Sequence, residues 1–408
     1  MVKFPVDSLD HRSSPTSPRE AYIRPFQTFS RVKAGLGSLK TLNQIVLLLK
    51  QVLDLNAFKE DKIQIIKNIH LEKLWLNRDF SFKENIIRKE INSLRNGDFS
   101  KVYKENYIYD FKKCDGIFYL GGGYFNSNWK NFLYHAFIYP LYLAKYFRKI
   151  VFVSGINFGP FESYDFEIMK EIFPAVSGVI VRDRHYSRKC LNSLRINKDK
   201  ILDGVDDVFF LGELPELKKN REYMVVQLHL PIPNEFLKNS FIMKEIAKFL
   251  DYLVKTHKWE IIYMPFSTYL KADYYQGTIL NDLMEEKKCF RQLKPTIDYK
   301  HMRSIIKGAK FVLATRFHPI VFATAEDVPC ISIVKNELYR IKLRGAYESC
   351  NKRPYLINIS DINLDILIQF FKEIFLSGTN KLNLKFVKDI KRRKTDFVLK
   401  RFFSQIGK

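Results

Sequence analysis

Short apolar runs alternate with helix-length stretches through most of this chain. Seven such runs are each followed by glycine, proline or polar residues, at 117–120, 150–153, 179–181, 224–228, 261–264, 311–314 and 330–334. Runs of three to five mostly apolar residues with helix-length spacers between them are typical of parallel strands joined by crossover helices. The pattern therefore predicts an α/β protein.

A charged segment, Glu213–Arg221, interrupts this alternation and predicts a linker between two doubly wound domains. A capped apolar run beginning at Thr41 predicts extra helices before the first strand. We therefore expect five parts. They are an irregular arm over 1–40, an N-terminal Rossmann-like domain with a helical extension over 41–212, the linker 213–221, a C-terminal Rossmann-like domain over 222–365, and basic helices over 366–408.

Charge and composition narrow the class of protein. The 408 residues include 68 Lys and Arg against 44 Asp and Glu, a formal net charge of +24. A surplus of this size favours anionic partners such as nucleic acid, phosphates, an acidic polysaccharide or a membrane surface. Hydrophobic residues make up 46% of the chain, enough to build a large core, which excludes general disorder.

The C-terminal segment 380–408 is strongly basic and carries an apolar stripe. Two interpretations stay open, a terminal helix packed on a domain and a helix lying on an anionic membrane surface. The apolar segment 131–144 is too short to span a bilayer, and the first 24 residues are polar. We expect a cytoplasmic protein, with peripheral association at the inner face of the membrane.

Metal chemistry finds little support in the sequence. The five cysteines are scattered and form no C-x-x-C pair, which argues against a zinc site. Asp203, Asp206 and Asp207 lie close together, but no histidine or further acidic cluster accompanies them. We expect no metal site, and a turn or hinge near the linker at these aspartates.

Two strand ends carry residues suited to binding an anion. Gly121, Gly122 and Gly123 follow the first strand, where they would expose backbone N–H groups at the next helix; a turn without a ligand is the alternative. Arg316 and His318 follow the strand 311–314. Arginine offers a planar fork for phosphate or carboxylate, and histidine exchanges a proton near neutral pH. Together at a strand end, they favour a functional site over separate structural roles.

These residues belong to a series of short motifs that resembles the polysaccharide pyruvyl transferases. The series includes G-G-G-Y at 121–124, G-P at 159–160, V-R-D at 181–183 with Ser187, D-x-V-F-x-L at 206–211, R-F-H-P at 316–319 through Pro329, and Y-x-x-K-x-x-G at 339–345. Two positions depart from the family pattern: Asp207 stands where proline is usual, and Ser127 stands where some members have aspartate.

The resemblance implies a fold of two Rossmann-like doubly wound domains facing a cleft (GT-B-like). It also implies transfer of a pyruvyl group from phosphoenolpyruvate to a sugar, forming a ketal on a cell-surface polysaccharide or its lipid-linked precursor, without a cofactor. Arg182, Arg316, Lys342 and the three glycines would bind the donor anion. His318, with Arg316, would be catalytic, His318 as the acid for the enol carbon or the base for the hydroxyl. Further candidates for the site are Asp183, Asp206 and Tyr339.

Two other functions are open at this point. A glycosyltransferase of the same architecture would use a sugar nucleotide, and Glu326 would then suit a ribose contact. A non-catalytic basic protein would bind a polyanion, but the sequence contains no recognisable nucleic-acid module, so we expect no nucleic-acid partner. Arg-x-His at a strand end favours the pyruvyl transferase.

Overall fold

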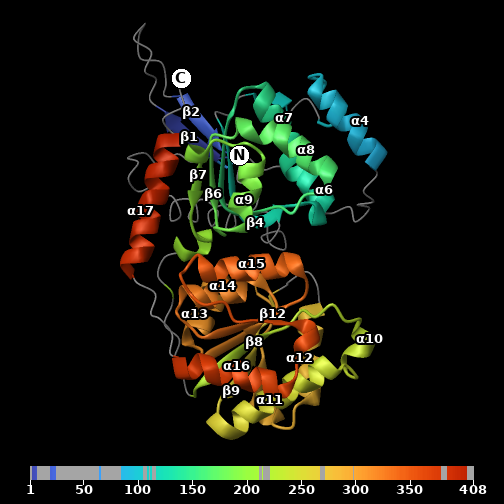
Figure 1. Ribbon diagram of the computed structural model, residues 1–408, viewed down its shortest axis with the longest axis vertical. Coiled ribbons are helices and arrows are strands. Elements are labelled where there is room, and N and C mark those ends of the chain that lie inside the picture. The colour runs from blue at the N-terminus through green and yellow to red at the C-terminus, as the bar shows by residue number, and fades with distance from the viewer. Residues whose placement is uncertain are drawn as a thin grey trace. The chain divides into compact units, whose positions relative to one another are not determined.

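The computed structural model describes residues 2–6, 19–23, 64–65, 84–103, 108–109, 111–112, 116–210, 214, 221–266, 272–296, 298–377 and 384–401. The chain divides into two compact units: unit 1 comprises Met1–Phe210 with Lys388–Lys408, and unit 2 comprises Leu211–Val387 (Figure 1). The capped run predicted from Thr41 and most of the predicted linker lie outside the described residues. The described part of the helical extension contains α4 (Glu84–Arg95).

The arm predicted to be irregular contains two strands. β1 (Val2–Val6) pairs antiparallel with β2 (Arg19–Ile23), and β3 (Gln64–Ile65) pairs with the other edge of β1. The physical reason is visible in the sequence, where Val2, Phe4 and Val6 alternate with Lys3 and Pro5. A period of two is the pattern of a strand, and it escapes notice beside a Ser/Pro-rich segment.

Unit 1 is built on a parallel sheet whose described strands follow the chain order. They are β4 (Gly116–Phe125), β5 (Ile150–Phe158), β6 (Gly178–Val181) and β7 (Ile201–Asp203). The helices between them are α6 (Lys130–Leu133), α7 (Tyr139–Tyr146), α8 (Ser163–Ile172) and α9 (Tyr186–Ser193). Alternate strand residues, among them Tyr119 and Val153, join the helices in one buried core.

The three glycines lie inside β4, which corrects the prediction that they form a turn at the start of a helix. The strand continues to Phe125, and its register with β5 shifts between Gly122 and Phe125. Gly122 has a φ of 132°, a conformation that residues with a Cβ rarely adopt. Glycine therefore permits an irregularity within the strand instead of ending it.

The C-terminal helix α17 (Leu384–Arg401) covers the second face of this sheet (Figure 1). Phe397 packs against Phe152 with ring centroids 5.8 Å apart, and Phe152 stacks on Phe118. Ile390, Lys394 and Val398, each one helical turn apart, are buried. Of the two interpretations of the basic tail, the structure supports the packed helix for this apolar face. Among the described residues, no helix combines the length and apolar character needed to cross a bilayer.

Unit 2 contains a six-stranded parallel sheet in the order β10-β9-β8-β11-β12-β13. The strands are β8 (Tyr223–Gln227), β9 (Glu260–Tyr263), β10 (Phe290–Gln292), β11 (Phe311–Ala314), β12 (Cys330–Val334) and β13 (Leu356–Asn358). The chain starts at β8, proceeds to one edge, then returns to β11 and proceeds to the other. This doubly wound order has its switch point between β8 and β11, where α/β proteins bind ligands.

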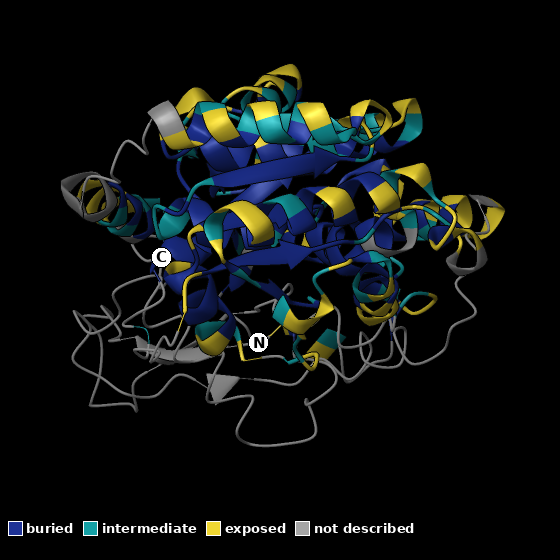
Figure 2. Ribbon diagram, turned by 90° about the horizontal axis from the view of Figure 1, so that it is seen from below, coloured by how far each residue is buried: buried dark blue, intermediate teal, exposed yellow. Residues whose placement is uncertain are grey.

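Helices cover both faces of the unit 2 sheet, whose central strands are buried while the outer helix turns are exposed (Figure 2). They are α10 (Asn234–Leu237), α11 (Phe241–His257), α12 (Ala272–Leu283), α13 (Tyr299–Gly308), α14 (Phe317–Ala325), α15 (Glu337–Glu348) and α16 (Leu364–Ser377). Ser240, Asp298 and Asn336 cap α11, α13 and α15 through side-chain oxygens that accept backbone N–H groups. The segments left at the carboxyl edge of the sheet hold the polar residues described next.

Candidate functional site

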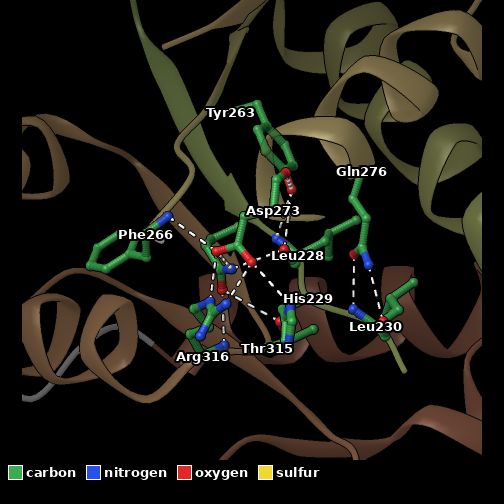
Figure 3. A network of polar contacts seen from close by, with 10 residues as sticks. Leu228, His229, Leu230, Tyr263, Phe266, Asp273, Gln276, Thr315 and Arg316 are labelled. Atoms are coloured by element: carbon green, nitrogen blue, oxygen red, sulfur yellow. Dashed lines mark hydrogen bonds and ion pairs between the residues drawn. The ribbon is translucent and has the colours of Figure 1, made fainter. Parts of the chain in front are cut away.

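The switch point of unit 2 gathers polar side chains from three segments. Gln227 ends β8 and His229 follows it, Thr315 and Arg316 follow β11, and Asp273 lies in the first turn of α12. All of these residues belong to unit 2, and Figure 3 shows how they lie around the Asp273 carboxylate. We call this group the switch-point cluster.

Asp273 is the centre of the cluster. Its side chain has no exposed surface and accepts two hydrogen bonds from Arg316, Nε to Oδ2 and Nη2 to Oδ1, each 2.6 Å long. The amide of Gln227 and the backbone N–H of Phe266 also donate to Oδ2, each at 3.2 Å. His229 Nδ1 lies 3.0 Å from Oδ1. A buried carboxylate with this many donors is stabilised in its charged form.

The loop after β8 is held in place on both sides of His229. The Gln276 side chain accepts from the backbone N–H of Leu230 at 2.8 Å and donates to its carbonyl at 3.0 Å. The hydroxyl of buried Tyr263 lies 3.2 Å from the Leu228 carbonyl and donates to the Asp273 carbonyl at 2.7 Å. A Cβ at Gly277 would lie 2.4 Å from the Tyr263 ring, so α12 can approach this ring only with glycine there. The backbone therefore fixes the position of His229.

Charges within the cluster shift its titration. Burial raises the pKa of the Asp273 carboxyl. The contacts with His229 and Arg316 lower it by more than burial raises it, so the pKa lies below the ordinary 3.8. The contact with Asp273 raises the pKa of His229, but burial and the charges of Arg316 and Lys335 outweigh it and bring it below 6.5. Burial, then Arg316, lowers the pKa of Lys335 to about 8. At pH 7, Asp273 and Arg316 are charged, Lys335 is mainly charged and His229 is mainly neutral.

The predicted residues of unit 2 lie at the start of α14 and on α15. Arg316 precedes α14 and His318 lies in its first turn, where the positive end of the helix dipole favours anions. Lys335 follows β12, and its Nζ lies 4.1 Å above the Tyr339 ring. Lys342 Nζ lies 5.9 Å from the same ring, one turn along α15. Both lysines thus lie near the Tyr339 ring, and one of them, Lys335, influences the His229 pKa.

The predicted residues of unit 1 form a separate buried network. Arg182 is 3% exposed; its Nε donates to Asn157 at 2.7 Å and its Nη1 pairs with Asp206. Asp183 accepts from the Asn157 amide at 2.8 Å and from the backbone N–H and hydroxyl of Ser187. These contacts hold the ends of β5 and β6 together. Arg182 and Arg316 lie in different units, so their convergence on one donor stays a prediction.

The aspartates predicted to form a hinge are engaged in ion pairs. Asp206 pairs with Arg182, and Asp207 accepts from Ser154 and pairs with Lys394 of α17. Both aspartates are 7% exposed. The cations that neutralise these two residues come from distant parts of the chain, and the hinge interpretation stays a prediction. Asp207, one of the two departures from the family pattern, is thus one of the residues that hold α17.

Two further positions singled out in the sequence have structural partners. The Ser127 hydroxyl donates to buried Asp165 at 2.6 Å and accepts from the backbone N–H of Glu162 at 2.7 Å. The carboxylate of Glu326, suggested for a ribose contact, accepts from Arg303 at 2.5 Å, with both side chains at most 10% exposed. The Glu326 carboxylate is therefore bound to a protein side chain, Arg303, and not placed to contact a ribose. Among the described residues, no three His, Cys, Asp or Glu side chains gather as a metal site would require.

Asp273, His229, Gln227 and Lys335 were not identified from the sequence. Three of them had a signal, since Gln227, His229 and Lys335 lie at the ends of apolar runs just as Arg316 does. Asp273 had none, because its importance depends on pairing with Arg316, 43 residues further along the chain.

The structure is that of an α/β protein with a doubly wound sheet and charged side chains at its switch point. The family comparison is more specific: a model described as polysaccharide pyruvyl transferase matches residues 46–336, most of the chain. The chain belongs to the polysaccharide pyruvyl transferase family, and the family predicted from the sequence motifs is confirmed.

Solved structures with a similar fold are distant in sequence. The S. aureus MnaA–UDP structure has 11% identity and a TM-score of 0.50, over 80% of this chain and 83% of that one. A UDP-GlcNAc 2-epimerase from Methanocaldococcus jannaschii has 15% identity and a TM-score of 0.49, over 73% and 81%. The first likeness supports the predicted GT-B-like α/β class, and at this identity it shows the fold alone. No curated protein matches the chain.

Proposed function

We propose that the protein transfers a pyruvyl group from phosphoenolpyruvate to a sugar of a cell-surface polysaccharide or its lipid-linked precursor, forming a ketal. The observation that carries the proposal is family membership combined with Arg316 and His318 at the switch point of a doubly wound sheet. The family makes the protein a transferase, and the choice of donor and acceptor is our inference.

The cluster suits a donor that carries a phosphate and a carboxylate. Asp273 holds Arg316 through Nε and Nη2, so the guanidinium plane is fixed and Nη1 remains for a donor oxygen. Lys335 adds charge that acts on His229, Lys342 lies beside Tyr339 on α15, and the first turn of α14 presents the positive end of its dipole. Fixed cations stabilise the charge that develops when phosphate leaves, without reorganisation during the reaction.

The reaction needs a proton on the enol methylene and loss of protons from the sugar hydroxyls. His318 is suited to this exchange, since it is partly exposed in the first turn of α14, two residues from Arg316. The scheme uses no cofactor. We propose that it takes place in the cytoplasm, with lipid-linked acceptors reached at the inner face of the membrane.

Thermal denaturation with candidate ligands tests the donor. We expect phosphoenolpyruvate to raise the unfolding temperature, since binding to the folded state alone stabilises it. His318→Asn should keep this stabilisation while losing transfer, because asparagine can hydrogen-bond but cannot exchange a proton near pH 7. Stabilisation by UDP or GDP without any effect of phosphoenolpyruvate would instead favour the glycosyltransferase. The ribose contact expected at Glu326 speaks against that function, because the Glu326 carboxylate is paired with Arg303.

A further inference from the structure

A second histidine lies at the same sheet edge as His318. His229 follows β8 at the switch point, and its side chain is 26% exposed. Its backbone is fixed through Leu228 and Leu230 by Tyr263 and Gln276. The pyruvyl transfer proposed above needs an acid for carbon and a base for oxygen, and the motif-derived residues supply one histidine for both tasks.

The two ring nitrogens of His229 have different surroundings. Nδ1 is inaccessible to solvent and lies 3.0 Å from Asp273 Oδ1. A carboxylate only accepts, so the neutral ring carries its proton on Nδ1. Nε2 then has an unshared electron pair, and among the described residues it has no hydrogen-bond partner. The exposed part of the ring is the part that includes Nε2.

The charges around His229 favour its neutral form at pH 7. Asp273 from α12 stabilises the imidazolium, while Arg316 after β11 and Lys335 after β12 oppose it together with burial. A base must be unprotonated before it reacts, and its conjugate acid must be stable once formed. The charges of Arg316 and Lys335 keep His229 unprotonated before the reaction, and the charge of Asp273 stabilises the imidazolium once it has formed.

We infer that His229 is the general base that removes the proton from the attacking sugar hydroxyl, with Asp273 as its positioning residue. The inference rests on the proposed function and leaves His318 as the acid. His318 donates a proton to the methylene carbon, and the sugar oxygen forms its bond to the adjacent carbon as its proton passes to His229 Nε2. The phosphate leaves with the electron pair of its C–O bond, and a second hydroxyl closes the ketal. Of the two hydroxyl protons, one replaces the proton given to carbon and the other leaves with phosphate.

Two substitutions at His229 separate a catalytic role from a structural one. In His229→Asn, an amide replaces Nδ1 beside Asp273, but no group can take up a proton. In His229→Ala, the space left by the ring can admit imidazole from solution. We expect both variants to keep stabilisation by phosphoenolpyruvate and to lose 10²- to 10⁴-fold of acceptor-dependent phosphate release, the usual range for a general base. Imidazole should restore part of the activity of His229→Ala, increasingly as its neutral form rises with pH.

The pH profile and a control complete the test. Wild-type kcat/KM should rise with pH along a limb whose midpoint lies below 6.5, and this limb should be missing in His229→Asn. His301→Asn, on an exposed position of α13, should match wild type throughout. Two results would overturn the role of His229 and leave the proposed function standing. One is wild-type turnover with a His229→Asn variant that is equally active, and the other is a His229→Ala variant whose activity imidazole does not restore. A wild type that neither binds nor consumes phosphoenolpyruvate would overturn the proposed function and this inference with it.

Discussion

Asp273 is the residue on which the switch-point cluster depends most. Its buried carboxylate fixes the Arg316 guanidinium, faces His229 and accepts from the segment after β9. A carboxylate without exposed surface is costly to bury unless it is paired and hydrogen-bonded, and here it is both. The cluster therefore acts as a unit, and replacing any one member should weaken the contacts of the others.

Asp273→Asn should destabilise unit 2 by about 2–3 kcal/mol, because it leaves Arg316 without its countercharge. This loss of stability is smaller than for a fully buried ion pair, since Arg316 is 23% exposed. The folded-state pKa of Asp273 is depressed, so this contribution is fully present above pH 3.8 and is lost as the pH falls below it. Urea unfolding at several pH values measures both the loss of stability in Asp273→Asn and the pH dependence of stability in wild type. Asp282→Asn, exposed on the same helix, is the control. Equal stabilities for Asp273→Asn and wild type at pH 7 would contradict this account of the cluster.

Arg316→Lys should reduce donor turnover by about 2–3 kcal/mol of transition-state stabilisation, roughly 30- to 160-fold in kcat/KM. Lysine keeps the charge but loses the planar fork, which here must hold Asp273 and present Nη1 at the same time. Phosphate release from phosphoenolpyruvate measures the effect. Arg344→Lys, largely exposed on α15, is the matched control. Near-normal turnover in a folded Arg316→Lys protein would remove Arg316 from the donor site.

At this scale the sequence predicted some residues and missed others for physical reasons. Arg316 and His318 could be proposed because a strand end is visible in the apolar pattern and both residues follow it directly. His229 follows a strand in the same way, but its proton chemistry depends on Asp273, Arg316 and Lys335, which come from three other segments. The ion pairs of Asp206 and Asp207 could not be predicted, because their cations, Arg182 and Lys394, are distant in the chain.

At the scale of elements, α17 combines a basic composition with a buried face. The sequence left two interpretations open, a packed helix and a helix on a membrane surface, and the structure shows Lys394 1% exposed and paired with Asp207. Burial lowers the pKa of Lys394 and Asp207 opposes this shift. The sequence could show the apolar stripe of the helix, but it could not show which face of which sheet the stripe covers.

The glycines of β4 resemble a strand end in the sequence, because glycine marks turns more often than irregular strands.

Lys394→Ala should destabilise unit 1 by about 3 kcal/mol or more, since it leaves Asp207 buried without a cation. Chemical denaturation, with Arg393→Ala at an exposed position of the same helix as control, measures the difference. Combining Lys394→Met with Asp207→Asn removes both charges and should recover much of the loss. A Lys394→Ala protein as stable as the control would show that the pair does not hold α17 in place.

The exposed side of α17 remains available for the proposed contact with an anionic membrane. Arg392 and Arg393 are exposed there, and each basic residue near such a surface contributes about 1 kcal/mol at low salt. Replacing both with glutamine should therefore reduce co-sedimentation with anionic liposomes roughly 30-fold at low salt, without loss of stability. Lys287 and Lys288, an exposed pair in unit 2, provide the matched double variant. Equal liposome binding by wild type and the Arg392/Arg393 variant would assign the attraction to the diffuse net charge instead.

The whole molecule combines two parallel-sheet units with a net charge of +24. The alternation of strands and helices was predictable, because buried parallel strands are continuous apolar runs that stand out from polar helices. The order of the strands was not, since it depends on pairings between residues far apart in the chain. The helices predicted together over 366–408 also belong to different units, α16 to unit 2 and α17 from Lys388 onward to unit 1.

The central claim is that this chain forms a pyruvyl ketal with phosphoenolpyruvate as the donor. The direct measurement is nuclear magnetic resonance of the purified protein incubated with phosphoenolpyruvate labelled with carbon-13 at its methylene carbon, and with polymeric or lipid-linked saccharides. We predict that the methylene signal is replaced by the methyl signal of a saccharide ketal, with one inorganic phosphate released per ketal, and that Arg316→Lys and His318→Asn form it far more slowly. Unchanged phosphoenolpyruvate with every acceptor, together with release of UDP or GDP from a sugar nucleotide, would contradict the claim.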